Sequence, residues 1–208
     1  MLIGILADAH GNAAAVRHAL EQLSGRVDQL IFAGDAIYEY RFSNELLELI
    51  REHRMHYVLG NHEMSLLGPN GARARAAPHV DLEHLEFLRS VPERIALDVD
   101  GRRLLVVHGS PWKPYDDYVY AASPILRRFS KLPYDYVVLG HTHVAMASRQ
   151  GSVLVINPGS VGESRDGTPN GRLSYAILDT ATDEVSFEYF ADPTNPVAIY
   201  FPLKNPDR

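Results

Sequence analysis

Seven residues whose side chains can bind a metal ion follow short apolar stretches of the chain. All of them offer oxygen or nitrogen atoms: Asp8, His10, Asp35, Asn61, His108, His141 and His143. Such donors suit divalent manganese, iron, zinc, cobalt or nickel better than calcium or magnesium. Seven ligands exceed what one such ion needs. The set therefore predicts two ions a few ångströms apart, with a carboxylate as the best bridge between them.

Predicted strands position these residues. Residues 2–7 form a continuous apolar run, typical of a strand buried on both faces, and Asp8 follows it. Residues 29–33 and 57–59 repeat the pattern before Asp35 and Asn61. Helical spacing of apolar residues separates these strands at 13–23 and 44–53, after the capping residues Asn12 and Ser43. In an open α/β sheet, functional side chains gather at the carboxyl ends of the strands, which would bring the donors together.

The second half of the chain favours hairpins. Asp100-Gly101 is a strong turn signal, and two further turns are expected at 150–151 and 180–183. The strands expected here are 95–99, 103–107, 136–139, 144–149, 152–156, 172–179, 184–190 and a short piece at 198–201. Residues 82–88 and 115–131 are predicted to be helical, the latter with a break at Pro124, and 64–78 to be irregular. The predicted fold class is α/β, a four-layer α-β-β-α sandwich of two mixed β-sheets with flanking helices, in a single domain over residues 1–208.

Composition limits the classes of function. The 208 residues are 46% hydrophobic and 22% charged, as in an ordinary globular domain. The net charge of -6 argues against binding an extended nucleic acid through a broad basic surface. With no cysteine, disulfides and thiolate ligands are excluded, which favours a cytoplasmic protein. The apolar runs are strand-sized, so neither a signal peptide nor a membrane span is expected.

The ordered motifs resemble those of the calcineurin-like metallophosphoesterases. They are Asp8-x-His10, Gly34-Asp35, Gly60-Asn61-His62-Glu63, His108 and Gly140-His141-Thr142-His143. The segment 157–162, Asn-Pro-Gly-Ser-Val-Gly, is similar to a loop in the small microbial phosphodiesterase branch of that family. Each motif alone is ordinary turn chemistry, whereas five in order at successive strand ends are specific.

The resemblance implies two divalent metal ions and a role for each ligand. One ion would take Asp8, His10, Asp35 and His143, and the other Asp35, Asn61, His108 and His141, with Asp35 bridging. The implied reaction is hydrolysis of a phosphate diester by a metal-bridging hydroxide, with manganese favoured in an assay. His62 would be the catalytic imidazole, supporting the leaving oxygen in its protonated form, and Glu63 would orient and charge that imidazole.

Two features depart from relatives. Glu63 stands where many family members carry aspartate, and the arginine with which the protein phosphatases grip phosphate is missing after Gly34-Asp35. This weighs against a protein phosphatase and for a phosphodiesterase, although Arg41 is a candidate substitute. The alternatives are a phosphomonoesterase or nuclease that uses the same centre, and a non-catalytic metal-binding scaffold, as in a retromer subunit that resembles this family.

Other residues are candidates for supporting roles. Asn12 is a candidate contact to the substrate phosphate as well as a helix cap. Asn157 and Ser160 are expected to support the metal histidines. Aromatic residues after His108 can line a substrate pocket, stack a base or pack in the core: Trp112, Tyr115, Tyr118 and Tyr120. The expected partner is a small phosphodiester substrate, and a homo-oligomer is possible through the edge of the hairpin at 172–190.

Overall fold

The first of two five-stranded sheets is built around the N-terminal strand. The computed structural model describes residues 1–165 and 171–194. Strand β1 (Leu2–Leu6) pairs in parallel with β2 (Gln29–Phe32), and β2 pairs in parallel with β3 (His56–Tyr57). On its other side β1 lies antiparallel to β9 (Arg172–Asp179), which pairs with β10 (Glu184–Ala191) at the edge. The order β10-β9-β1-β2-β3 makes this sheet mixed, as predicted.

The second sheet has the order β4-β5-β6-β8-β7. Strands β4 (Arg94–Val99) and β5 (Arg102–Val107) form the hairpin around Asp100-Gly101. Strand β6 (Tyr136–Val138) runs parallel to both β5 and β8 (Val153–Pro158), and β7 (Ala145–Gln150) pairs antiparallel with β8 at the edge. The predicted hairpins of this half are confirmed.

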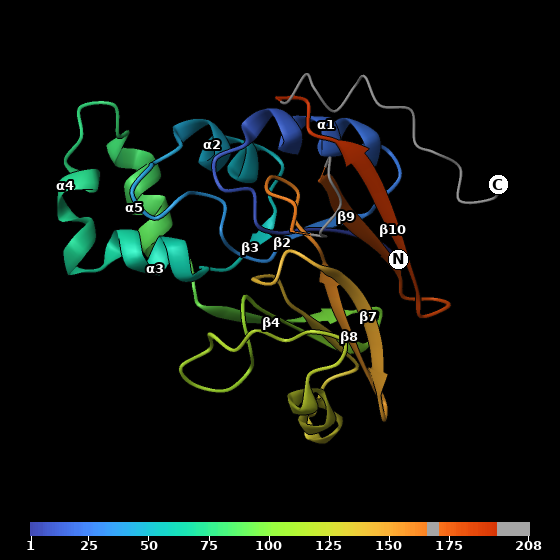
Figure 1. Cartoon of the computed structure of the whole chain (residues 1–208). Coiled ribbons are helices and arrows are strands. Elements are labelled where there is room, and N and C mark those ends of the chain that lie inside the picture. Colours follow the sequence, from blue (N-terminus) through green and yellow to red (C-terminus); the bar gives the residue numbers. More distant parts are fainter. Residues whose placement is uncertain (166–170, 195–208) are drawn as a thin grey trace.

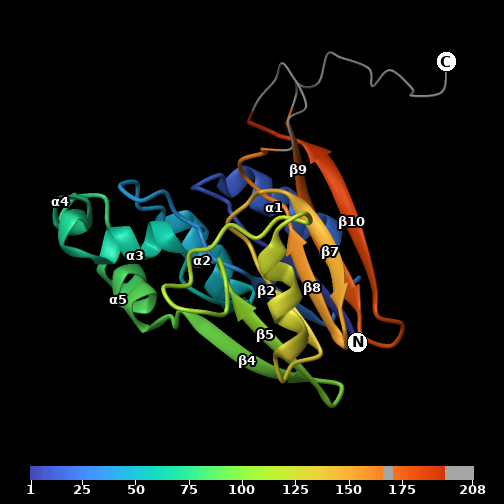
Figure 2. The same ribbon diagram turned by 60° about the horizontal axis from the view of Figure 1, so that its bottom comes forward.

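The two sheets pack face to face, with an outer layer on each side. Apolar side chains from both sheets form the central core, among them Ile5, Ile31, Leu104 and Ile156. The outer face of the first sheet is covered by helices α1 (Ala13–Leu23), α2 (Asn44–Glu52) and α5 (Leu82–Ser90), which lie in the upper half of Figure 1. The outer face of the second sheet is covered by the 3-10 helix η2 (Pro124–Lys131) and the loop before it, which Figure 2 shows in front of β5 and β8. The four-layer α/β sandwich is confirmed.

Two segments differ from their prediction. Residues 64–78 are not irregular, because they contain most of α3 (Asn61–Leu67), then η1 (Pro69–Gly71) and α4 (Ala72–Arg75). Glycine and proline here mark the borders between short helices, since Gly68 ends α3 and Pro69 begins η1. Conversely, the helix expected over 115–131 exists only from Pro124, as a 3-10 helix. Tyr115 has a positive φ of 72°, which a helix cannot contain.

Two further predictions concern the remaining segments. The short strand at 198–201 lies outside the described residues. None of the helices that the structure describes combines the length and the apolar character needed to cross a membrane.

Candidate metal centre

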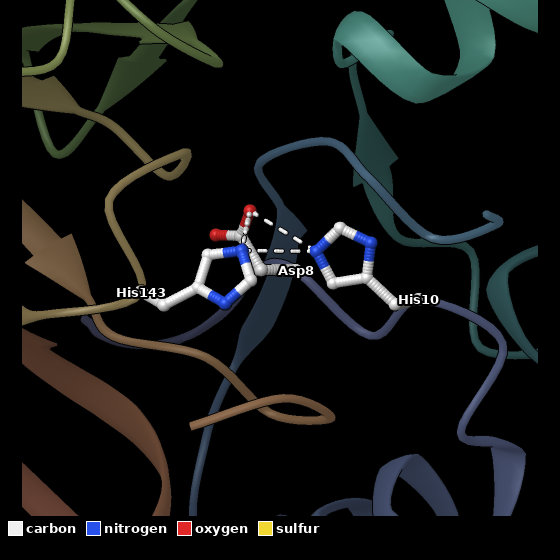
Figure 3. A group of neighbouring side chains, drawn as sticks. All are labelled: Asp8, His10 and His143. Atoms are coloured by element: carbon white, nitrogen blue, oxygen red, sulfur yellow. Dashed lines mark hydrogen bonds and ion pairs between the residues drawn. The ribbon is translucent and has the colours of Figure 1, made fainter. Parts of the chain in front are cut away.

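The first group of predicted ligands meets where β1 ends. His10 Nε2 and His143 Nε2 are 2.9 Å apart, and Asp8 Oδ1 lies 3.4 Å from His143 Nε2 and 3.9 Å from His10 Nε2. Figure 3 shows the two imidazoles pointing toward each other with the Asp8 carboxylate beside them. One carboxylate oxygen and two ring nitrogens therefore converge on one place, as the sequence predicted.

The second group lies beside the first, where β2 and β5 end. Asp35 Oδ2 is 3.1 Å from His108 Nε2, and Asn61 Oδ1 is 3.2 Å from the same nitrogen. The His141 ring lies 5.0 Å from the His108 ring. Asp35 also forms a group with His10 and His62, so its carboxylate stands between the two clusters. This is the position that a bridging ligand needs.

Backbone carbonyls and neighbouring side chains hold the ligands in place. His108 Nδ1 donates to the carbonyl of Ala33 at 2.7 Å, and His143 Nδ1 donates to the carbonyl of Glu163 at 2.6 Å, so each ring presents Nε2 to the centre. Asn157 donates to the carbonyl of Gly140 at 2.6 Å, and Ser160 Oγ donates to the carbonyl of Asp8 at 2.7 Å. Asn157 and Ser160 thus hold the backbone next to His141 and at Asp8, and their support of the metal histidines stays a prediction. The carbonyls of Ala33 and Glu163 carried no signal in the sequence, because any residue type supplies one.

His62 reaches the centre, but a different group orients it from the one predicted. The backbone N–H of Glu39 donates to His62 Nδ1 at 3.0 Å, and His62 Nε2 lies 3.7 Å from Asp35 Oδ2. Because Nδ1 accepts a hydrogen bond, the neutral ring carries its proton on Nε2. An imidazolium would direct an N–H at the N–H of Glu39. The hydrogen bond from Glu39 thus favours the tautomer that carries its proton on Nε2 and presents Nε2–H to the site, and the protonated form in catalysis stays a prediction.

The Glu63 carboxylate binds backbone N–H groups instead of the His62 imidazole, contrary to the prediction. Its fully buried carboxylate accepts three backbone N–H groups, from Gly60 at 2.7 Å, from Asp35 at 2.9 Å and from Ile37 at 3.0 Å. Burial, followed by the nearby charge of Asp35, raises the pKa of Glu63 to about 7, while the backbone donors oppose that rise. Glu63 therefore ties the loop of Asp35 to the start of α3, which fixes the bridging carboxylate relative to Asn61.

The charge balance of the centre depends on histidine. Burial would raise the pKa of Asp35, but the charge and hydrogen bond of His108 lower it below its usual range. Burial alone would lower the pKa of His108, but the charge and hydrogen bond of Asp35 raise that pKa above its usual value. Burial lowers the pKa of His10 and of His141 to about 4, so both rings are neutral at pH 7. Neutral imidazole is the form that binds a metal ion.

Most of the proposed ligands adopt an unusual backbone conformation. The left-handed region is occupied by five of them, with φ values of 58° for Asp8, 47° for His10, 54° for Asp35, 70° for His141 and 60° for His143. Asp and His tolerate this region better than most residues, and such conformations gather at functional sites.

Two other predicted site residues lie close by. Asn12 caps α1 by accepting from the N–H of Ala15, and its amide donates to the carbonyl of Gly162 and to Asp192. The cap is confirmed, and contact with a substrate phosphate stays a prediction. The Arg41 guanidinium lies 5.9 Å above the Tyr38 ring, which is itself 4.9 Å from the His62 ring. Tyr38 is a site neighbour that the sequence did not reveal.

The donor set fits two divalent ions. Asp8 and Asp35 contribute two carboxylates, Asn61 a neutral oxygen, and the four histidines nitrogen atoms. His141 Nε2 is buried and has no hydrogen-bond partner among the described residues. Within that part of the chain, no lysine or arginine forms an ion pair with Asp8 or Asp35. Buried carboxylates without a lysine or arginine partner, beside imidazoles that lose their proton when they bind a metal ion, are chemically suited to bound cations.

Comparison with known proteins defines the class. The family model described as the calcineurin-like phosphoesterase superfamily domain matches residues 1–183. The chain belongs to this superfamily, which uses divalent metals, and it is a metal-dependent phosphoester hydrolase.

Individual relatives cover most of the chain. A crystal structure of a metallophosphoesterase from Sphaerobacter thermophilus is 32% identical, with a TM-score of 0.74 over 92% of this chain and 89% of that one. Phosphodiesterase YfcE of Escherichia coli is 27% identical, covering 86% of this chain and 88% of its own length. Phosphodiesterase MJ0936 of Methanocaldococcus jannaschii is 25% identical, covering 88% and 96%. The resemblance in the motifs is thus confirmed over nearly the whole length.

Proposed function

We propose that this protein is a phosphodiesterase that hydrolyses a small phosphate diester at a centre of two divalent ions. The observation that carries the proposal is the convergence of all seven predicted donors on one end of the sandwich, with His62 beside them. The names of the relatives YfcE and MJ0936 support the diester. The absence of the phosphate-gripping arginine after Asp35 favours a diester over a monoester, since a diester carries less negative charge.

The chain's own residues have separate tasks in this proposal. Asp8, His10, Asp35 and His143 would hold one ion, and Asp35, Asn61, His108 and His141 the other. Bound ions of this kind lower the pKa of water from about 15.7 toward about 7 and stabilise charge on phosphate oxygens. His62 holds a proton on Nε2 and donates a hydrogen bond from it to the leaving oxygen, where negative charge develops. Glu39 keeps that tautomer, and Glu63 keeps Asp35 in register with α3.

Several finer points belong to the same proposal. Manganese is the ion favoured for assays, and the proposed substrate is small, not an extended nucleic acid, in keeping with the net charge of -6. The absence of cysteine supports a cytoplasmic location. Strand β10 is an edge of its sheet, which supports pairing of two copies.

The direct test is hydrolysis of bis(4-nitrophenyl) phosphate after the protein has been stripped with chelator and reloaded with manganese. We expect metal-dependent release of 4-nitrophenolate, and a loss of about 1,000-fold or more in Asp35→Asn, because the bridging carboxylate becomes a neutral amide. His62→Ala should lower kcat about 100-fold while the metal content stays at two ions per chain.

Asp183→Asn is a matched control, because it removes a carboxylate charge at the opposite end of the sandwich and should keep full activity. Absence of metal-dependent turnover in the wild type, or full turnover in Asp35→Asn, would refute the proposal.

A further inference from the structure

Two tyrosines extend from the proposed metal centre along the loop after β5. The Tyr118 ring stacks on the His141 ring, with centroids 3.9 Å apart and planes 29° apart, yet 52% of Tyr118 is exposed. Tyr120 lies 6.4 Å from Tyr118 and within 11° of parallel. His141 neighbours His108 in turn. A row of rings therefore leads from the proposed ligands to the surface.

The loop that carries these rings is fixed on both sides. Ser110 Oγ donates to Asp117 Oδ2 at 2.6 Å, next to Tyr118 in the chain. Trp112 packs edge-on against Phe129 at 5.0 Å, and the Arg128 guanidinium lies 3.9 Å above the Trp112 ring. Tyr118 is thus exposed but held. An exposed, preorganised aromatic face binds another ring with little loss of conformational freedom.

A cavity of about 430 Å³ lies beside this loop and reaches the proposed ligands Asn61 and His108. Tyr115 and Asp116 line it, two or three residues before Tyr118. Its volume is within the usual range for a small-molecule site. None of the described residues that line it is lysine or arginine, whereas Glu93 and Asp116 are acidic. Such a cavity disfavours a second phosphate and accepts an uncharged group with hydrogen-bond donors.

The position of His62 indicates which part of a diester would lie here. His62 does not line the cavity, and its ring lies 4.9 Å from Tyr38 and 4.8 Å from His10. Since His62 is proposed to donate to the leaving oxygen, the leaving group belongs on the Tyr38 side. The ester group that the product retains then belongs on the side of Tyr118 and the cavity.

We propose that Tyr118 and this cavity bind the retained ester group of the substrate, and that this group is uncharged and bears a planar ring, as a nucleoside does. The inference rests on the proposed phosphodiesterase function. Stacking on Tyr118 supplies affinity for the ring, and Glu93 and Asp116 exclude a further anion. The substrate class is therefore a diester with one nucleoside-like ester and no second phosphate.

The experiment compares two substrates with the same leaving group, thymidine 5′-(4-nitrophenyl phosphate) and methyl 4-nitrophenyl phosphate. Both retained esters are alkyl, so the phosphorus centres have similar intrinsic reactivity. We expect the manganese-loaded protein to favour the thymidine ester at least ~10-fold in kcat/KM, mainly through KM. Tyr118→Ala should bring that ratio close to one, and Tyr118→Phe should keep it. A 3′-phosphate on the thymidine should cancel the preference, and Glu93→Gln should restore part of it.

Controls separate recognition from structural damage. Because Tyr118 stacks on His141, the metal content of each variant is measured. If Tyr118→Ala lowers kcat/KM for the thymidine ester and the methyl ester by the same factor, so that their ratio is unchanged, the proposal is overturned. Tyr189→Ala, which removes a comparably exposed tyrosine on β10, should leave both activities unchanged.

Equal kcat/KM for the two esters in the wild type refutes this inference but leaves the phosphodiesterase intact, whereas no turnover of either refutes the proposed function. If neither ester is turned over, calorimetry can still test the binding site. Thymidine 5′-(methyl phosphate) should bind at least ~10-fold more tightly than dimethyl phosphate, and equal affinities would overturn the inference.

Discussion

The two ends of the sandwich treat their carboxylates in opposite ways. At the end away from the site, Asp183 in the turn between β9 and β10 accepts from Arg102 Nη1 and the Tyr136 hydroxyl, each at 2.6 Å, and from Arg149 Nη2 at 3.1 Å. Asp100 is likewise paired with the N-terminal amine at 2.8 Å. These carboxylates join the two sheets, and each has a cationic partner.

At the site end, Asp8, Asp35 and Glu63 are almost fully buried, and their partners are histidines and backbone N–H groups. At the far end, arginine and tyrosine side chains bind Asp183, so this carboxylate needs no metal ion. The site end keeps its negative charge in a place where solvent cannot screen it. The same sandwich therefore satisfies its carboxylates with its own cationic side chains at one end and leaves buried carboxylates suited to bind cations at the other.

Metal addition should produce the largest contrast between the two ends. Manganese at 100 to 1,000 times its Kd should raise the free energy of unfolding by about 3 to 4 kcal/mol, because it binds only the folded site. Thermal unfolding with manganese and with chelator measures this. Asp35→Asn should lose most of this manganese-dependent stabilisation, and Asp183→Asn should keep it. Equal stabilisation of the wild type and both variants would show that the two ends do not differ in metal binding.

Glu63 should be the next most sensitive position. Glu63→Ala leaves the buried N–H groups of Gly60, Asp35 and Ile37 without their acceptor, which should cost about 3 kcal/mol or more. Glu63→Gln keeps one accepting oxygen and should cost less. Urea unfolding of the metal-free protein gives both values. A cost below about 1 kcal/mol for Glu63→Ala would show that water can replace the carboxylate.

The two ends of the sandwich also differ in how closely other atoms surround a glycine. A Cβ at Gly60 would overlap Asp35 Oδ1 and lie 2.5 Å from the Asp35 backbone nitrogen, so Gly60→Ala must displace the bridging carboxylate. We expect a loss of about 100-fold in kcat. Gly101 at the far end has a φ of 73°, and a methyl group there would meet no atom within 4 Å, so Gly101→Ala should cost roughly 1 to 2 kcal/mol of stability and no activity. Steady-state kinetics and unfolding curves separate the two effects.

Asp183 should show the smallest effect, with a defined pH dependence. Asp183→Asn should cost about 1 kcal/mol or less at pH 7, since its ion pairs are partly exposed. The Tyr136 hydroxyl and two arginines lower the pKa of Asp183 below its unfolded value of about 3.9. Its contribution is therefore complete above that pH and is lost as the pH falls through the folded pKa. Unfolding at pH 7, 5 and 3 should show the variant approaching the wild type at pH 3.

The sequence predicted the strand ends well because two kinds of signal coincide there. An apolar run such as residues 2–7 specifies a buried strand, and polar donors such as Asp8 specify where it ends. Both signals are local. The helices in 64–78 were missed because each is shorter than the window of about 11 residues in which apolar spacing can be recognised.

The role of Glu63 and the contact of Tyr118 with His141 were missed for another reason. Both depend on loops that meet only in the folded chain, since Glu63 binds residues 26 and 28 positions away and Tyr118 follows no repeating pattern. The predicted partner of Glu63 was its sequence neighbour His62. In the folded protein, unpaired backbone N–H groups compete more strongly for a buried carboxylate.

The positive φ angles of Asp8, His10, Asp35, His141 and His143 have a consequence for how this protein can change over generations. Asparagine tolerates the left-handed region about as well as aspartate, whereas a β-branched residue does not. A single Asp→Asn exchange can therefore silence the chemistry while the loop keeps its course, and most other exchanges would damage both. An Asp→Asn exchange at one of these positions is therefore a direct way in which a hydrolase of this fold can become an inactive scaffold. The same exchange is the choice for engineering a stable version that does not cleave its substrate.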